Sequence, residues 1–169
     1  MASKKDAIAA EFYQRYLDLV KEDNVVKAIK KNTREFKKFI EKIPKKKIEF
    51  AYAENKWTIK EILQHIIDAE RVFVYRALTF ARKDSTPLPG FDENYWAANA
   101  QTSKRKWDDL VKEFKTLRKS TESLFEAFDE SQLLSNGTAS GKEINTLALG
   151  YICSGHVAHH IKIIKERYL

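Results

Sequence analysis

The four histidines are the residues whose type and spacing indicate chemistry. Three of them fall in the run GHVAHH at residues 155–160, and the fourth is His65. His156 and His160 are four residues apart, so on a helix their rings lie one turn apart on the same face. Two imidazoles at this spacing are how one helix offers two ligands to one metal ion, as in the HExxH zinc sites. Here Val157 follows the first histidine, so the sequence has the ligand spacing without the HExxH glutamate.

His65 supplies a third imidazole from a different part of the chain. It lies in an apolar stripe at helical spacing, made of Ile62, Ile66, Ala69 and Phe73. His156 and His160 lie in a second such stripe, with Leu149, Cys153 and Ile164. Both stripes predict helices whose histidines face the interior of a bundle, so the three rings could converge in one metal site. The alternative is three separate histidines, each satisfied by one hydrogen bond in the core or at the surface.

Three histidine ligands without a thiolate favour an open metal site. Catalytic zinc sites keep a position for water or substrate, whereas structural sites are closed. Imidazole also suits nickel, iron and copper, so the ligand set leaves the identity of the metal open. A metal ion held in this way lowers the pKa of a bound water or deprotonates a bound thiol. Hydrolysis of a small molecule and transfer of a small thiol are the two reactions that follow.

Three neighbouring residues have two interpretations each. Asp68 follows His65 by three residues and could orient its ring, or it could pair with Arg71 as an ordinary surface charge. Cys153 lies one turn before His156 and is either a core cysteine or part of a pocket. His159 points about 60° away from the face of the histidine pair. It is either an accessory to the site or simply exposed.

Helical periodicity predicts the elements that position these side chains. Asn24 is a good N-cap, Pro44 stops the helix before it, and Thr58 with Glu61 forms a capping box. The expected long helices, preceded by an extra N-terminal helical segment over residues 6–21, cover residues 24–43, 58–82, 103–128 and 145 to near the C-terminus. We expect loops over residues 44–56, 83–90 and 129–144. Residues 91–100 could be a loop or a short helix. We therefore predict an all-α four-helix bundle in which residues 1–169 form one domain.

The last of these helices differs from the others in charge. Residues 144–161 contain no Asp, Glu, Lys or Arg, although 33% of the chain is charged. Asn145 and the three histidines argue against a membrane span, so we expect a helix covered on all sides in the middle of the bundle. Gly150 and Gly155 are poor helix formers, and they predict close approach of another backbone or a ligand.

Composition excludes several classes of protein. The chain has 169 residues, 43% of them hydrophobic, which is too apolar for a disordered chain. One cysteine rules out an internal disulfide and a zinc site made of cysteines alone. The first residues, MASKKDAIAAEF, have no apolar core followed by a cleavage site, so we expect a cytoplasmic protein without a membrane anchor.

The net charge of +7 is concentrated in one segment. Residues 27–47 contain ten Lys and Arg against Glu35 and Glu41, mostly on one helix face. We interpret this surface as a solvated face. Phosphate binding is the alternative, but no nucleic-acid-binding motif accompanies it, so we do not expect a nucleic-acid partner.

Several motifs together resemble the DinB-like superfamily, which includes bacillithiol and related thiol S-transferases. The resemblance rests on KWTIKEILQHIIDAER at 56–71, YRAL at 75–78, LPGFD at 88–92, and GHVAHH at 155–160 running on to ERYL at 166–169. It implies an up-up-down-down four-helix bundle, often homodimeric, with a nickel or zinc ion held by three histidines. By motif these are His65, His156 and His160. The resemblance does not imply DNA binding.

The sequence therefore favours a metal-dependent enzyme, either a thiol S-transferase or a hydrolase, acting on a small molecule. The substrate could be a thiol, and a given preparation could lack the divalent ion. The alternative is a helical metal-binding or dimerisation module without enzymatic activity.

Overall fold

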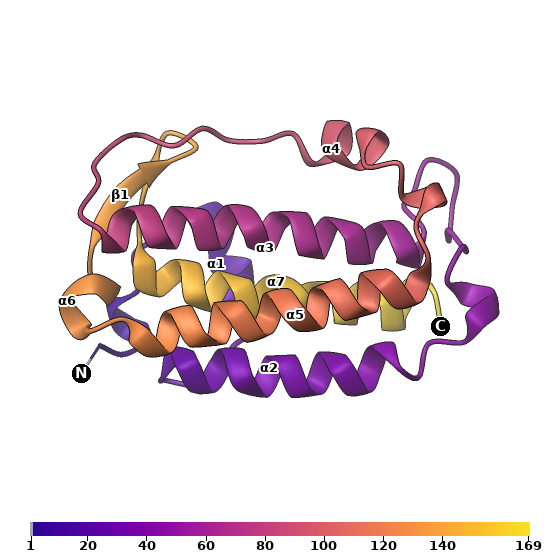
Figure 1. The fold of residues 1–169 in the computed structure, drawn as a ribbon, viewed down its shortest axis with the longest axis horizontal. Coiled ribbons are helices and arrows are strands. Elements are labelled where there is room, and N and C mark those ends of the chain that lie inside the picture. The colour runs from indigo at the N-terminus through magenta and orange to yellow at the C-terminus, as the bar shows by residue number, and fades with distance from the viewer. Residues whose placement is uncertain (1) are drawn as a thin grey trace.

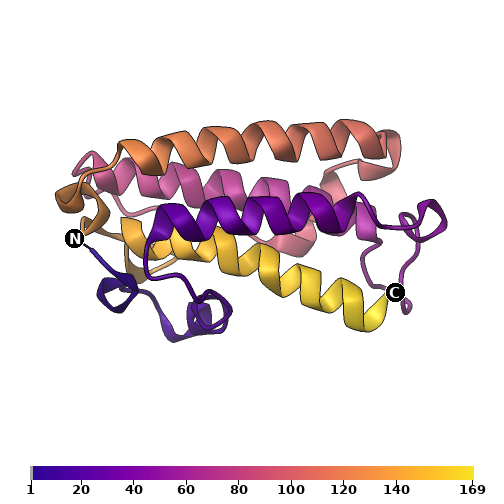
Figure 2. The same ribbon diagram turned by 90° about the horizontal axis from the view of Figure 1, so that it is seen from below.

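Four long helices form the bundle, as the sequence predicts. A computed structural model describes residues 2–169. The helices are α2 (Val25–Ile40), α3 (Ile59–Ala81), α5 (Trp107–Ala127) and α7 (Thr146–Arg167). Two run in each direction, in the order up, down, down, up along the chain (Figures 1 and 2). The four-helix bundle is as expected, but the order of directions differs from the up-up-down-down order that the resemblance implies. The parallel helices α3 and α5 are joined by a long crossover that passes along the bundle (Figure 1).

Helix α7 lies at the centre of the packing. It contacts α2 and α3, and α5 contacts the same two helices from the other side. Every residue from 144 to 157 is buried. This burial explains why the segment contains no charged residue, and it confirms the prediction of a helix covered all round.

The predicted helix starts are confirmed by their capping bonds. The Asn24 side chain accepts a hydrogen bond from the amide of Lys27 at 2.9 Å. Thr58 and Glu61 form the capping box, with the Thr58 amide donating to the Glu61 carboxylate at 2.7 Å and the Glu61 amide donating to Thr58 Oγ1 at 3.2 Å. Because the side chain that caps each helix start lies within three residues of the backbone amide it binds, the sequence pattern alone locates these starts.

The predicted N-terminal helix over residues 6–21 is wrong in its extent. The segment forms a 3-10 turn η1 (Lys4–Asp6), an extended stretch, and a short helix α1 (Glu11–Leu17) that packs on α7. Asn145 holds the extended stretch. Its backbone amide donates to the Ile8 carbonyl at 3.0 Å, and its side-chain oxygen accepts a hydrogen bond from the Ile8 backbone amide at 3.1 Å. These long-range bonds override the local helical pattern.

The predicted loop over residues 129–144 is also wrong. It contains a short helix α6 (Glu130–Leu133) and an antiparallel hairpin of β1 (Asn136–Ala139) and β2 (Lys142–Asn145). Ser140 and Gly141 form the turn of this hairpin, with φ values of 52° and 72°. The pair Asn136 and Gly137 lies within β1.

Gly137 is required by packing rather than by a turn. A Cβ at this position would lie 2.1 Å from the ring of Phe80, so only glycine lets β1 lie against α3 here. The remaining short elements lie in the other connections: η2 (Lys45–Lys47), α4 (Glu93–Asn99) and η3 (Thr102–Lys104). Helix α4 resolves the open expectation for residues 91–100.

One arginine connects all four long helices. Arg118 of α5 is fully buried, and its Nε donates to Glu70 of α3 at 2.6 Å. Its two terminal nitrogens donate to Asn32 of α2 at 3.1 Å and to the Cys153 carbonyl of α7 at 2.6 Å. Thr121 donates to the second Glu70 oxygen at 2.7 Å. The ion pair is therefore satisfied on both sides, as a buried pair must be.

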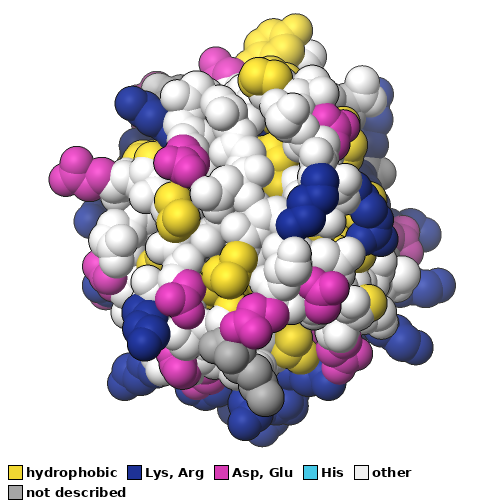
Figure 3. Space-filling model, turned by 90° about the vertical axis from the view of Figure 1, so that its left-hand side faces the viewer, with side chains coloured by type: hydrophobic (Ala, Val, Ile, Leu, Met, Phe, Trp, Pro, Cys, Tyr) yellow, Lys and Arg dark blue, Asp and Glu magenta, His cyan; other side chains and the backbone are white. Residues whose placement is uncertain are grey.

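The outer face of α2 is polar and partly paired. Lys30 forms an ion pair with Glu126 of α5, and Lys31 pairs with Glu22 at 2.6 Å. At the end of the bundle near the hairpin, acidic side chains are interspersed with basic and hydrophobic ones (Figure 3). These pairs fit the interpretation of a solvated face.

Among residues 2–169, no helix is long and apolar enough to cross a membrane.

We expect Arg118→Met to lower the free energy of unfolding by about 3–5 kcal/mol, because Glu70 is left as an uncompensated buried charge. The double variant Arg118→Met/Glu70→Met should recover most of this loss. Lys30→Met removes a pair in which both side chains are 44% exposed and should cost less than about 1 kcal/mol. Urea unfolding followed by circular dichroism measures all three. A loss for Arg118→Met as small as that for Lys30→Met would contradict the buried-pair interpretation.

Candidate metal site

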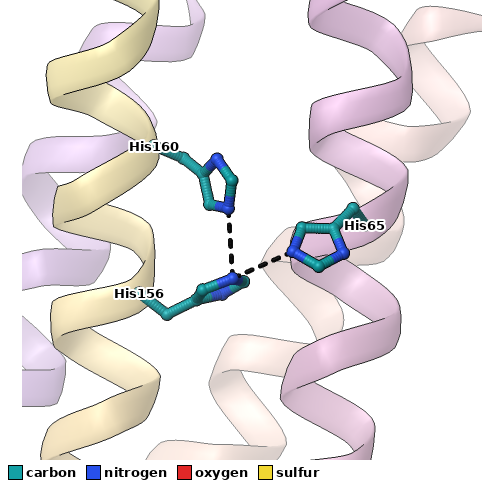
Figure 4. Close-up of side chains that lie close together, drawn as sticks. All are labelled: His65, His156 and His160. Atoms are coloured by element: carbon teal, nitrogen blue, oxygen red, sulfur yellow. Dashed lines mark hydrogen bonds between the residues drawn. The ribbon is translucent and has the colours of Figure 1, made fainter. Parts of the chain in front are cut away.

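The three predicted histidines converge at one point between α3 and α7. His65 projects from α3, and His156 and His160 project from consecutive turns of α7 (Figure 4). The Nε2 atom of His156 lies 3.0 Å from that of His65 and 3.1 Å from that of His160. One ring nitrogen from each residue lies within 4.8 Å of the others, and all three side chains are buried. The prediction that the rings converge is confirmed.

Hydrogen bonding alone does not account for this arrangement. A ring nitrogen carries either one hydrogen or one lone pair in the plane of the ring. His156 Nε2 therefore makes one good hydrogen bond, yet it has two nitrogen neighbours at hydrogen-bond distance. Two imidazole nitrogens that bind one ion at about 2.1 Å lie about 3.0 Å apart at a right angle and about 3.4 Å apart at the tetrahedral angle of zinc. The donor set thus fits a divalent ion better than it fits a chain of histidine hydrogen bonds.

Burial keeps these rings neutral. It lowers the pKa of His65 from 6.5 to about 4, with a smaller contribution from the nearby His159. Burial likewise holds the pKa values of His156 and His160 well below 6.5, and the neighbouring histidines lower them further. Neutral imidazoles present lone pairs, so at pH 7 the three residues are in the form that ligates metal.

Aromatic rings surround the histidines. The Trp57 ring lies 4.8 Å from that of His65, measured between centroids, and the Tyr16 ring lies 5.4 Å from that of His156. The Tyr168 hydroxyl donates to the Trp57 carbonyl at 2.6 Å and so ties the C-terminus to this cover. These rings limit the access of water to the cluster.

Gly155 explains how Tyr16 comes so close. A Cβ on Gly155 would lie 2.0 Å from the Tyr16 carbonyl oxygen, so any larger residue would push α1 away from α7. The predicted close approach at this glycine is therefore a backbone contact. The residue directly before His156 sets the position of the aromatic cover above it.

Two cavities border the cluster. One of about 200 Å³ is lined by His65 and His156, and a second of about 220 Å³ is lined by His160 and Trp57. Three protein ligands leave coordination positions open on an ion, and small cavities beside them give room for a substrate.

The other candidate residues lie outside the cluster. Asp68 accepts two hydrogen bonds from Gln64 at 3.0 Å and lies 3.6 Å from Arg71, so it makes no bond to His65. Cys153 is buried in the apolar core, where burial raises the pKa of its thiol. His159 is half-buried against Tyr16 and contributes no nitrogen to the cluster. One departure from a usual metal site is His160 Nδ1, which is buried and has no hydrogen-bond partner among residues 2–169.

Comparison with known families agrees with this geometry. The family model of the DinB superfamily matches residues 28–164. The chain belongs to the DinB superfamily. All three clustered histidines lie inside the matched region, whereas Tyr16 and the rest of α1 lie before it. No curated protein sequence matches this member of the superfamily.

A solved structure shows the same fold. YfiT from Bacillus subtilis is similar to this DinB-superfamily chain with a TM-score of 0.74 and 14% sequence identity, over 94% of this chain and 87% of YfiT. YfiT is described as "a probable metal-dependent hydrolase with an unusual four-helix bundle topology". At this identity the similarity shows the fold.

Sequence reasoning did not identify Tyr16 as part of the cover. Its ring belongs to a segment that the sequence assigned to a separate N-terminal helix. The signal that points to it is indirect: Gly155 directly precedes the histidine run and requires a close neighbour.

In the metal-free protein, acid should destabilise the fold through these histidines. Above pH 6.5 His65 is neutral in both the folded and the unfolded chain. Between pH 6.5 and about 4 the unfolded chain takes up a proton that the folded chain excludes, so stability is lost as the pH falls through this window. For His65 alone the loss is about 3 kcal/mol.

We expect His65→Asn to make the loss of stability between pH 7 and pH 4.5 smaller by about 2–3 kcal/mol. His159→Asn, which removes a half-buried ring, should change it less. Denaturant titrations of the chelator-treated protein at several pH values measure this difference. Equal pH dependence in wild type and His65→Asn would show that the ring is not held neutral.

Proposed function

We propose that His65, His156 and His160 bind one divalent ion, nickel or zinc, and that the protein is a metal-dependent enzyme acting on a small molecule. The observation that carries this proposal is the convergence of three neutral, buried imidazole nitrogens beside two cavities. Among residues 2–169, the cluster contains no fourth metal-binding side chain. A bound ion would lower the pKa of a water or thiol that occupies an open position.

The ligand set strengthens this effect. Three neutral imidazoles leave the full charge of a divalent ion to act on the group bound beside them, whereas thiolates or carboxylates would offset part of it. The residues around the histidines have a second role. Trp57 and Tyr16 exclude bulk water from the rings, so charge interactions at the site act in a medium of low polarity.

Hydrolysis and thiol transfer are the two reactions proposed. The description of YfiT as a hydrolase supports the first, and the resemblance to thiol S-transferases supports the second. Both begin from a nucleophile made acidic at the same position, so one set of variants tests both. We further propose that residues 1–169 form one domain in a cytoplasmic homodimer, and sedimentation equilibrium tests the dimer.

We expect tag-free protein loaded with zinc or nickel to retain about one equivalent after desalting, since three ligands from two rigid helices hold an ion with little reorganisation. His156→Ala should weaken binding by more than about 100-fold. His159→Ala is the matched control, because it removes a neighbouring imidazole outside the cluster and should leave binding intact. Elemental analysis gives the stoichiometry. Less than about 0.2 equivalents for both metals would contradict the proposed site.

We expect the loaded protein to turn over small activated substrates. The screen pairs hydrolysis of 4-nitrophenyl acetate with transfer of a cysteine thiol to 1-chloro-2,4-dinitrobenzene, each followed by absorbance. Activity should disappear with a chelator and in His160→Ala, and it should persist in His159→Ala. A protein that binds one equivalent of metal but is no faster than His160→Ala in any substrate tested would instead be a helical metal-binding module without enzymatic activity.

A further inference from the structure

Arg76 of α3 is a buried cation without a carboxylate partner among residues 2–169. Its side chain is 1% exposed. One terminal nitrogen donates to the Pro89 carbonyl at 2.7 Å and to Ser140 Oγ at 3.1 Å, and the other approaches the Tyr13 hydroxyl at 3.4 Å. The Nε–H is buried and has no acceptor. An arginine side chain stays charged at neutral pH, so a full positive charge is buried without a counter-charge.

Arg76 differs in this respect from the other fully buried arginine. Arg118 pairs with Glu70, and every nitrogen of its guanidinium has an acceptor. A buried charge without a partner costs free energy, so proteins seldom keep one for packing alone. The uncompensated charge of Arg76 therefore points to an anion that completes the site.

The guanidinium belongs to the same cavity as the histidine cluster. Arg76, His65 and His156 all line the cavity of about 200 Å³. Along α3, His65, Ala69, Phe73 and Arg76 follow one another at spacings of four, four and three residues, so they share one helix face. His65 and Arg76, the first and last of these residues, are about 16 Å apart along the helix axis. Long side chains on a helix point back toward its N-terminus, which for Arg76 is the direction of His65.

Part of the wall of this cavity is apolar. Phe73, Phe91 and the ring of Tyr13 line it together with the cation and the histidines. Glu93 also lines it, but this side chain is exposed and forms no ion pair with Arg76. A cavity with apolar rings and one buried cation favours a ligand with one negative charge on an apolar body.

Two connections of the bundle hold the guanidinium in place. Pro89 belongs to the crossover between α3 and α5, and Ser140 belongs to the turn of the hairpin. Leu88 and Ala139 pair as an isolated bridge, which fixes these two segments to each other. The Arg76 side chain is therefore positioned before any ligand arrives.

We propose that Arg76 binds the carboxylate of a small apolar substrate whose reacting group lies at the three-histidine cluster. This inference rests on the proposed function for its second half, the position of the reacting group. A carboxylate accepts charge-assisted hydrogen bonds from a guanidinium and brings the one negative charge that the site lacks. A phosphate dianion would bring a second charge that one guanidinium does not neutralise.

The test compares a carboxylate with its neutral amide. NMR titrations with 3-phenylpropionate and 3-phenylpropanamide give the two dissociation constants for metal-free and for zinc-loaded protein. We expect metal-free wild type to bind the carboxylate at least about tenfold more tightly than the amide. Arg76→Met should abolish this preference and leave amide binding unchanged, which also shows that the variant is folded.

Arg71→Met is the matched control. Arg71 is 49% exposed, pairs with Glu113, and does not line this cavity, so its removal changes the net charge equally and should keep the preference. If Arg76→Met does not fold, Arg76→Lys keeps the charge but loses the planar fork. The preference should then fall at least about threefold, and an unchanged preference overturns the proposal.

The outcomes separate this inference from the proposed function. Equal binding of the two probes to wild type, or a preference that survives in Arg76→Met, overturns the carboxylate site. A preference that requires zinc and survives without Arg76 means that the carboxylate ligates the ion, which also overturns it. If the protein fails to bind metal but keeps the Arg76-dependent preference, the carboxylate site stands and the metal-dependent function falls.

Discussion

The buried guanidinium of Arg118 is the constraint on which the rest of the structure depends. From α5 it binds α2, α3 and α7, and its partners lie close to the clustered histidines: Glu70 is five residues after His65, and Cys153 is three residues before His156. Hydrogen bonds to a fully buried charge have defined directions and no competing water. They therefore add to apolar packing in fixing the relative position of α3 and α7.

The histidine cluster follows from that fixed geometry. Since α3 and α7 hold the three histidines at set positions, the ring nitrogens meet without a flexible loop, and burial by the surrounding helices lowers the pKa values of these rings. The same burial that makes the rings neutral makes the histidines unfavourable as isolated core residues. In the metal-free chain the buried histidines therefore lower the stability of the fold. An ion bound to the three rings would raise the free energy of unfolding again.

The sequence predicted the parts of this structure that are encoded locally. The starts of three helices, at Asn24, Thr58 and Asn145, depend on residues within one turn of each other. The direction of the histidines toward the bundle interior depends on residues within one or two turns. The extended stretch around Ile8 was not predicted, because bonds to Asn145, far along the chain, hold it. The hairpin was not predicted either, although its own strand pairing is local. Arg118 was missed although it continues the spacing of Leu110 and Phe114, since a charged residue on an apolar stripe is easily assigned to the surface.

The division between predictable and unpredictable segments coincides with a division of roles. The periodic helices α3 and α7 carry the histidines, whereas α1, the crossover and the turn of the hairpin complete the walls of the neighbouring cavity. Loops and termini tolerate change better than packed helices do. A bundle of this kind can therefore keep one arrangement of histidines while the segments around it alter what reaches them. In this chain Gly155 links the histidine-bearing part of the site to the surrounding part, that is, α7 to α1, because it admits the backbone of Tyr16 against the helix that carries His156.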